Sequence, residues 1–371
     1  MKKMLIVGIS DTIGGIEKLF KDLFSTKSQI FQISFLSFSE SCAFEEIYRN
    51  NGYTIYHLPP RGKHPFSFNK IVRSFYAEHN DFDYIWINTA STSMYQMQLY
   101  GKKYTKAKII THSHGTKFEK SSGMWKYLLN SFLDIINHRK VVENTDLFFC
   151  CSYAAGEALF GKRYREKLIL IKNGIDVDRF KYDEKKRHEI RSKYLLNDDF
   201  TIGIIGRLSN QKNPIRAIQI FKTFNDRVKH SKLIVVGDGP LKEAVSREVK
   251  KLGIMDNVIF TGYRDDVDGF YSAIDCLLMP SLFEGLPLSV IEAQTSGVSC
   301  LLSDKITKEV KILDNCQFEN LNDNNKVWSD SIIRIKQNKT GDTLRDNAFI
   351  SIINNGYTIN QTRSFVEELL K

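Results

Sequence analysis

Two glutamates stand eight positions apart in the segment from Glu284 to Glu292, with Gly285 and Pro287 between them. The apolar run before them and the helical spacing after them predict a strand, a tight turn and a helix. Glu284 then lies in the turn and Glu292 about one turn into the helix. The backbone N–H groups at such a helix start, over residues 285–289, suit a phosphate, and a carboxylate accepts two hydrogen bonds from a ribose. The plainer interpretation has Glu284 favouring the helix dipole and Glu292 facing solvent.

A second charged segment follows another apolar run, at residues 200–205. Gly206 and Arg207 come directly after this predicted strand, and Lys212 stands immediately before a predicted helix. Arginine offers a planar fork of donors and lysine a mobile point charge, so the two together suit a diphosphate. Two ordinary surface cations beside a loop are the alternative. Near the amino terminus, Gly14 and Gly15 stand at a strand-to-helix turn and would permit a ligand to approach the backbone closely.

Short apolar runs alternate with amphipathic stretches along the 371 residues, a pattern typical of parallel sheets flanked by helices. The sequence therefore predicts two open α/β domains with a ligand cleft at the carboxyl ends of their strands. The basic and apolar start, residues 1–9, favours a first strand over a leader peptide. Strands are expected at residues 4–9, 30–38, 54–58, 84–88, 108–112, 147–151, 168–171, 200–205, 232–236, 258–260, 276–279 and 299–302.

Residues 124–142 have the apolar spacing of a helix that buries a wide face. The residues of that predicted face are Trp125, Leu128, Leu129, Phe132, Ile135 and Ile136.

The net charge of +10 is concentrated in the first half of the chain. Residues 1–180 hold 25 Lys and Arg against 17 Asp and Glu, and the remainder hold 28 against 26. Such a lobe could face an anionic membrane or a phosphorylated ligand, or could simply keep the surface soluble. No nucleic-acid-binding motif is visible, so a nucleic-acid partner is not expected. Much of the excess comes from Lys102, Lys103, Lys106, Lys108, Lys117, Lys120 and Lys126.

The six cysteines lack the spacing of a zinc site, and no apolar run reaches the roughly 18 residues that span a bilayer. This thin cysteine usage fits a reducing cytoplasm. We therefore expect a cytoplasmic protein.

In their order along the chain, these segments resemble the retaining glycosyltransferases of family four, which have the GT-B fold. The matching pieces are Gly14-Gly15, Asn173-Gly174-Ile175-Asp176, Gly206-Arg207-Leu208 with Lys212, Gly237-Asp238-Gly239-Pro240-Leu241, Phe260-Thr261-Gly262-Tyr263, and the segment from Glu284 to Glu292. Bacterial capsular and exopolysaccharide enzymes are the most similar members. The resemblance implies two Rossmann-like domains facing across a cleft. An acceptor-side domain would span residues 1–173, a donor-binding domain residues 174–356, and a last helix over residues 357–371 would cross back to the first domain.

The resemblance also implies roles for individual residues. Arg207 and Lys212 would bind the donor diphosphate, Glu292 its ribose and Glu284 the transferred sugar. The backbone of Gly285, Leu286, Pro287 and Leu288 would lie along the donor.

Further implied contacts lie on other segments. Tyr263 and Arg264 would contact the nucleobase, and Gly14 and Gly15 the phosphates or the acceptor. A strand-end histidine near the sugar would be His112 or His114, with His112 preferred because it ends the predicted strand. A hydrogen-bonded loop histidine is the alternative for either one.

The implied activity is transfer of a sugar, from a UDP-sugar by preference, to a lipid-linked or polysaccharide acceptor at the inner face of the membrane. No metal and no cofactor beyond the nucleotide sugar is expected. Asp265 and Asp266 resemble a helix cap more than a metal-binding pair. A nucleotide-sugar epimerase of the same architecture, or a non-enzymatic binder of nucleotide or nucleic acid, is the alternative function.

Overall fold

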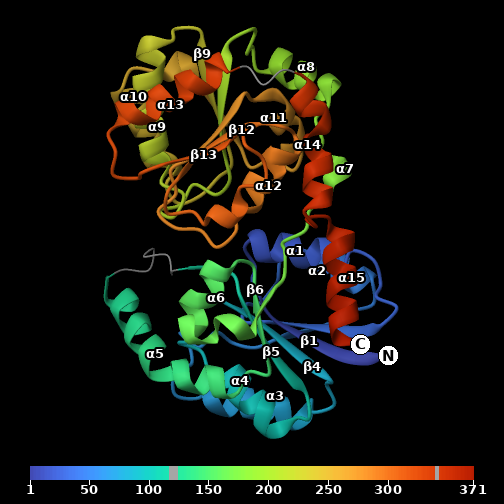
Figure 1. Ribbon diagram of the computed structural model, residues 1–371. Coiled ribbons are helices and arrows are strands. Elements are labelled where there is room, and N and C mark those ends of the chain that lie inside the picture. The colour runs from blue at the N-terminus through green and yellow to red at the C-terminus, as the bar shows by residue number, and fades with distance from the viewer. Residues whose placement is uncertain (117–123, 339–341) are drawn as a thin grey trace. The chain divides into compact units, whose positions relative to one another are not determined.

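The computed structural model describes residues 1–116, 124–338 and 342–371, and among these the side chains of 124–130 and 342–344 lie outside the description. The chain divides into two compact units (Figure 1). Unit 1 is Met1–Gly174 with Ile359–Lys371, and unit 2 is Ile175–Thr358. The sequence analysis placed these divisions after residues 173 and 356. Within unit 2, the two ends of the chain segment pair with one another through a parallel bridge between Ile175 and Thr358.

Unit 1 contains a seven-stranded sheet of order β3-β2-β1-β4-β5-β6-β7, in which every neighbouring pair is parallel. Both faces of the sheet are covered, so its strands are apolar almost throughout. Met4 and Ile6 of the first strand pack into one core, while Leu5 and Val7 pack into another. The strands are β1 (Lys2–Ile9), β2 (Phe31–Ser37), β3 (Thr54–His57), β4 (Tyr84–Thr89), β5 (Lys108–Ser113), β6 (Leu147–Cys150) and β7 (Leu168–Leu170).

The helices of unit 1 include the last one of the chain. This helix, α15, packs beside α1, and Val366 and Leu370 join the core on that face of the sheet (Figure 1). Arg363 donates to the carbonyl oxygens of Leu23 and Asp22, which close the end of α1. The helices are α1 (Gly15–Leu23), α2 (Glu45–Asn50), α3 (Phe68–Glu78), α4 (Gln96–Tyr104), α5 (Met124–Glu143), α6 (Tyr153–Phe160) and α15 (Ile359–Leu370).

Unit 2 repeats the same plan with a six-stranded parallel sheet of order β10-β9-β8-β11-β12-β13. In chain order this is the 3-2-1-4-5-6 arrangement of a Rossmann-like domain. The strands are β8 (Phe200–Ile205), β9 (Ser231–Val236), β10 (Val258–Gly262), β11 (Cys276–Met279), β12 (Ser299–Ser303) and β13 (Cys316–Glu319). The helices are α7 (Val177–Phe180), α8 (Glu184–Lys193), α9 (Pro214–Arg227), α10 (Lys242–Lys251), α11 (Val267–Ala273), α12 (Leu288–Thr295), α13 (Asn325–Gln337) and α14 (Asp342–Asn354).

The predicted α/β class and both parallel sheets are confirmed. The twelve predicted strands are all present. Residues 200–205 and 276–279 have the predicted bounds, and the ends of the other ten differ by one or two residues. The strand β13 and the helices α2, α3, α4, α6, α7, α13 and α14 were not predicted from the sequence.

The buried face predicted for α5 is wrong in its described part. Phe132, Ile135 and Ile136 are 59, 79 and 48% exposed. The helix instead turns a polar face inward, where Ser91 donates to the Asp134 carboxylate and Asn137 is buried. Trp125, Leu128 and Leu129 lie outside the described side chains. Apolar spacing alone does not identify the inner face when hydrogen bonds anchor a helix.

The predicted lysine cluster lies at the amino edge of the first sheet. Lys102 and Lys103 end α4, Lys106 lies in the connection and Lys108 begins β5, and all four are exposed. Lys117, Lys120 and the side chain of Lys126 are outside the described residues. No helix within the described residues is long and apolar enough to cross a bilayer.

Candidate functional site

The loops that follow β8 and β11 meet at the carboxyl edge of the second sheet. Lys212 Nζ lies 2.8 Å from Glu284 Oε1, and the two side chains are 21 and 7% exposed. Removing two charges from water is costly unless they are paired, so each of these groups depends on the other. Both residues were predicted site residues, and the structure brings them into contact although they are 72 positions apart in the sequence.

Further hydrogen bonds join the same two loops. Gln211 Nε2 donates to Glu284 Oε2 at 2.9 Å and to the carbonyl oxygen of Phe283 at 3.2 Å. The backbone N–H of Leu282 donates to the Gln211 carbonyl, and Asn213 Nδ2 donates to that of Pro280. Both carboxylate oxygens of Glu284 are therefore held. Gln211 was not predicted from the sequence, because its side chain has no charge to distinguish it.

Two glycines of the β9–α10 turn allow the Arg207 loop its close packing. A Cβ on Gly237 would lie 2.0 Å from the Gly206 carbonyl oxygen, and one on Gly239 would lie 2.6 Å from that of Leu208. Both glycines also have positive φ, which disfavours any side chain. Glycine is thus required at both positions for the Arg207 loop to reach the site edge.

Arg207 is exposed at this edge. Within the described residues its side chain makes no hydrogen bond or ion pair. A cation that is exposed and unpaired keeps its full set of donors for an anion.

Glu292 lies on α12, one turn from the helix start at Leu288. It is only 5% exposed, which excludes the interpretation of a solvent-facing helix residue. Tyr271 on α11 donates its hydroxyl to Glu292 Oε2 at 2.7 Å. No motif or spacing in the sequence marks Tyr271. Of the predicted donor-lining residues before the helix, Gly285, Leu286 and Pro287 are buried and Leu288 is half-buried.

Tyr263 and Arg264 follow β10, and their side chains bind neighbouring carboxylates. The Tyr263 hydroxyl donates to Asp265, and its pKa rises to about 12 through burial and that carboxylate. Arg264 donates two hydrogen bonds to Asp266. Asp266 stands at the cap of α11, but its carboxylate does not bond the helix backbone. Within the described residues no three His, Cys, Asp or Glu side chains gather as metal ligands would.

In unit 1, the Gly14–Gly15 turn is occupied by a carboxylate of its own. Glu17, 5% exposed, accepts from the backbone N–H of Gly14 through Oε2 and from both the N–H and the hydroxyl of Ser10 through Oε1. The Gly14 N–H is therefore engaged, and Gly15 begins α1. The sequence analysis missed Glu17.

His112 and His114 lie at the carboxyl end of β5, with ring centroids 3.9 Å apart. His114 Nε2 is 2.8 Å from Asn88 Oδ1. His112 Nδ1 accepts from the indole N–H of Trp86 at 3.2 Å, and since that N–H can only donate, the His112 proton is on Nε2. This Nε2–H is buried and has no partner in the described part of the chain. An unsatisfied buried donor favours a ligand contact at His112 over His114.

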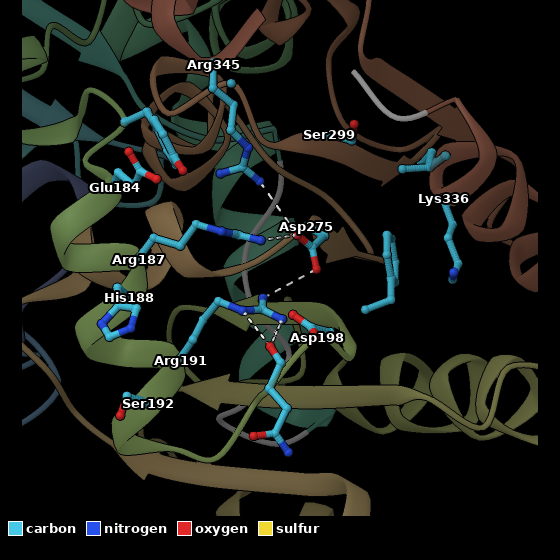
Figure 2. A pocket seen from close by; sticks show the side chains of 15 residues that line it. Glu184, Arg187, His188, Arg191, Ser192, Asp198, Asp275, Ser299, Lys336 and Arg345 are labelled. Atoms are coloured by element: carbon cyan, nitrogen blue, oxygen red, sulfur yellow. Dashed lines mark hydrogen bonds and ion pairs between the residues drawn. The ribbon is translucent and has the colours of Figure 1, made fainter. Parts of the chain in front are cut away.

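A cavity of about 960 Å³ lies elsewhere in unit 2 (Figure 2). Phe200, Asp275 and Ser299 line it, at the starts of β8, β11 and β12, so it belongs to the opposite, amino edge of the second sheet. It contains none of the predicted site residues.

Two family models match this chain, one on each half. Residues 13–179 match Glycosyltransferase Family 4, and residues 186–348 match Glycosyl transferases group 1. The two matches together cover most of the chain and follow the division into two units.

Individual proteins show the same similarity. One relative is EpsF of Bacillus subtilis, which is named as a glycosyltransferase. It is 28% identical to this chain, and the match covers 90% of this chain and 87% of EpsF. A second relative is the UDP-Gal:alpha-D-GlcNAc-diphosphoundecaprenol alpha-1,3-galactosyltransferase of Escherichia coli. It is 27% identical to this chain, and the match covers 53% of this chain and about half (51%) of that protein. Among solved structures, Anabaena HepE in complex with UDP and glucose superposes with a TM-score of 0.80 at 16% identity, covering 100% of this chain and 99% of its own. That likeness establishes the fold as GT-B.

The buried histidines predict a pH dependence of stability. Burial, and for His112 the neighbouring His114, lowers the pKa of both imidazoles, so they stay neutral when the unfolded chain binds protons. Their contribution is complete above pH 6.5 and is lost as the pH falls below it. Between pH 6.5 and 5.5 we expect each to reduce the free energy of unfolding by about 1 kcal/mol. Denaturant unfolding at several pH values measures this slope.

The variant His112→Phe should reduce the slope of the free energy of unfolding against pH by about 1 kcal/mol per pH unit. This holds even if the variant is more or less stable than wild type at every pH. Phe149→Leu, a buried substitution beside His112 that removes no titratable group, is the matched control and should keep the wild-type slope. An unchanged slope in His112→Phe would contradict a neutral buried His112.

Proposed function

We propose that this chain, which belongs to the glycosyltransferases of Family 4 and group 1, transfers a sugar from a nucleotide donor to a lipid-linked or growing polysaccharide acceptor. The observation that carries the proposal is the carboxyl edge of unit 2, where the exposed Arg207 lies on the loop that holds the Lys212–Glu284 pair. Cations beside a carboxylate suit a donor that has an anionic diphosphate and a neutral sugar. The acceptor-side role of unit 1 and the donor-side role of unit 2 are part of the proposal.

The relatives favour a UDP-sugar and a lipid-linked acceptor. The Escherichia coli relative is named for UDP-Gal and for a diphosphoundecaprenol acceptor, and Anabaena HepE was solved with UDP and glucose. The similarity to the Vi polysaccharide biosynthesis protein VipC/TviE of Salmonella typhi, 27% identical over 41% of this chain, supports a place among polysaccharide enzymes.

The proposed transfer retains the configuration of the sugar. The bond from the anomeric carbon to the diphosphate breaks as the acceptor oxygen attacks the same face, and the leaving phosphate oxygen takes the acceptor proton. Arg207 and Lys212 stabilise the charge that develops on the diphosphate. Glu284, fixed by Lys212 and Gln211, holds the sugar, while the His112 Nε2–H donates to a sugar oxygen. No protein nucleophile is required in this scheme.

Removing either cation should lower the rate of sugar transfer. We expect Arg207→Ala and Lys212→Ala to lower kcat/KM about 100-fold, the usual loss when one donor to a developing charge is removed. Nucleotide release from a panel of UDP-, GDP- and TDP-sugars measures it. Because the Arg207 side chain makes no hydrogen bond or ion pair in the described residues, we expect Arg207→Ala to keep the fold intact. Lys222→Ala removes a half-buried cation paired with Asp226 and should stay within about twofold of wild type.

Two outcomes would remove this site assignment. Turnover that is unchanged in Lys212→Ala and in Glu284→Ala would show that the edge of unit 2 does not bind the donor. Turnover of none of the donors by the wild type would remove the donor class.

The proposed chemistry uses cations of the protein in place of a divalent metal. We expect that EDTA leaves donor turnover within about twofold of the untreated enzyme. Complete loss of activity that Mn²⁺ restores would contradict this metal-independent scheme.

We propose in addition that unit 1 rests on the cytoplasmic face of an anionic membrane through α5. Phe132, Ile135 and Ile136 form an exposed apolar stripe there, and the exposed Arg139 and Lys140 lie one turn further on. Such a helix binds the interface through its apolar side chains and its attraction to anionic lipids.

Vesicle cosedimentation tests this contact. Wild-type protein should bind phosphatidylglycerol vesicles, and Ile135→Asp should weaken the binding about tenfold by removing one buried apolar side chain. Ile350→Asp, at a 43% exposed position on α14, is the matched control. Equal binding of wild type and Ile135→Asp would exclude α5 as the contact.

A further inference from the structure

Tyr271 is a fully buried side chain that touches the predicted ribose-binding carboxylate. Its hydroxyl is 2.7 Å from Glu292 Oε2, and its ring packs edge-on against Phe180. Burial and the Glu292 carboxylate raise the pKa of the Tyr271 hydroxyl well above 10, so the hydroxyl keeps its proton and is the donor. Glu292 is then the acceptor in this bond.

Tyr271 is held in place from the other edge of the sheet. The carbonyl oxygens of the three residues that follow it, Ser272, Ala273 and Ile274, accept hydrogen bonds from three arginines. These arginines are Arg187, Arg191 and Arg345.

The same three guanidinium groups surround Asp275, as Figure 2 shows. They come from α8 and α14, so two helices fix the carboxyl end of α11. The cavity beside them is thus lined by groups already used to brace α11. A braced helix end gives the Tyr271 hydroxyl one defined position.

The Glu292 carboxylate has one oxygen engaged and one available. In the described part of the chain Tyr271 is the hydrogen-bond partner of Oε2, and Oε1 makes no hydrogen bond. A carboxylate that rotates freely would distribute its lone pairs over several directions. The Tyr271 bond restricts that rotation and fixes where Oε1 points.

We propose that Tyr271 is a positioning residue that orients Glu292 to accept from the ribose hydroxyls, which makes this site selective for ribonucleoside over 2′-deoxyribonucleoside diphosphates. The proposal rests on the nucleotide donor of the proposed function. A site built to bond a hydroxyl rejects the analogue that lacks it, because a buried polar group is then left unpaired. The selectivity for the ribonucleotide therefore depends on the orientation of the Glu292 carboxylate as well as on its presence.

Calorimetric binding of UDP and of 2′-deoxy-UDP tests the proposal without turnover. GDP, CDP and ADP are titrated in the same way, each with its 2′-deoxy form. The variants are then compared with the pair whose ribonucleotide binds the wild type most tightly. We expect the ribonucleotide to bind wild type at least about tenfold more tightly, as one hydrogen bond to a charged group provides. Tyr271→Phe should reduce that ratio about fivefold, mainly by weakening the ribonucleotide.

Two further variants separate orientation from mere stability. Tyr76→Phe removes an equally buried hydroxyl in unit 1, one without a partner in the described structure, and should leave the ratio unchanged. Glu292→Gln should lose selectivity to at least the same extent as Tyr271→Phe. Thermal unfolding of each variant confirms that the binding data come from folded protein.

The outcomes distinguish this proposal from the one it rests on. A wild-type ratio retained in Tyr271→Phe but lost in Glu292→Gln overturns the role of Tyr271 and leaves the ribose contact standing. A ratio retained in both variants, or equal binding of both nucleotides by wild type, overturns the role of Tyr271 and the ribose contact together. Binding of no nucleotide overturns the proposed donor class as well.

Discussion

The ion pair between Lys212 and Glu284 is the constraint on which the edge of unit 2 depends. It joins two loops that come from adjacent strands, and both partners are largely withdrawn from water. Loss of either partner leaves a buried charge, which costs roughly 3–5 kcal/mol. Gln211 and Asn213 add hydrogen bonds between the same loops. Such a pair is suited to a ligand that has its own negative charge, because Lys212 can bind a phosphate oxygen while it and Gln211 still hold Glu284.

Around this pair the rest of unit 2 works as a rigid support. The glycines at positions 237 and 239 let the Arg207 loop pack against the next turn, where any side chain would clash. On the far edge of the sheet three arginines bind the end of α11 and Asp275. The carboxyl end of α11 is therefore fixed, and Tyr271, which directly precedes the braced residues, donates to Glu292 from that end.

Much of this architecture could be predicted from the sequence, because parallel strands that are buried on both faces leave long apolar runs. Charged residues that follow such runs lie at the carboxyl ends of the strands, where ligands usually bind. This position is why Arg207, Lys212, Glu284 and Glu292 were chosen as candidate site residues. The helix α5 could not be oriented, because Asp134 anchors it through hydrogen bonds that apolar spacing does not reveal. Gln211, Glu17 and Tyr271 were missed for a related reason. Each one acts through a partner that is distant in sequence or that carries no distinctive pattern.

The buried carboxylate under the first glycine turn has an electrostatic consequence for unit 1. Glu17 already neutralises the positive end of α1 and bonds the Gly14 amide, so an incoming phosphate would meet a resident negative charge there. The helix that follows the first strand of each unit comes after a turn of this kind, and in unit 2 the exposed Arg207 lies beside that turn. Like charges repel most strongly where water is excluded. The charge of Glu17 therefore disfavours a phosphate at the amino-terminal turn, and an uncharged hydroxyl group would meet no such repulsion there.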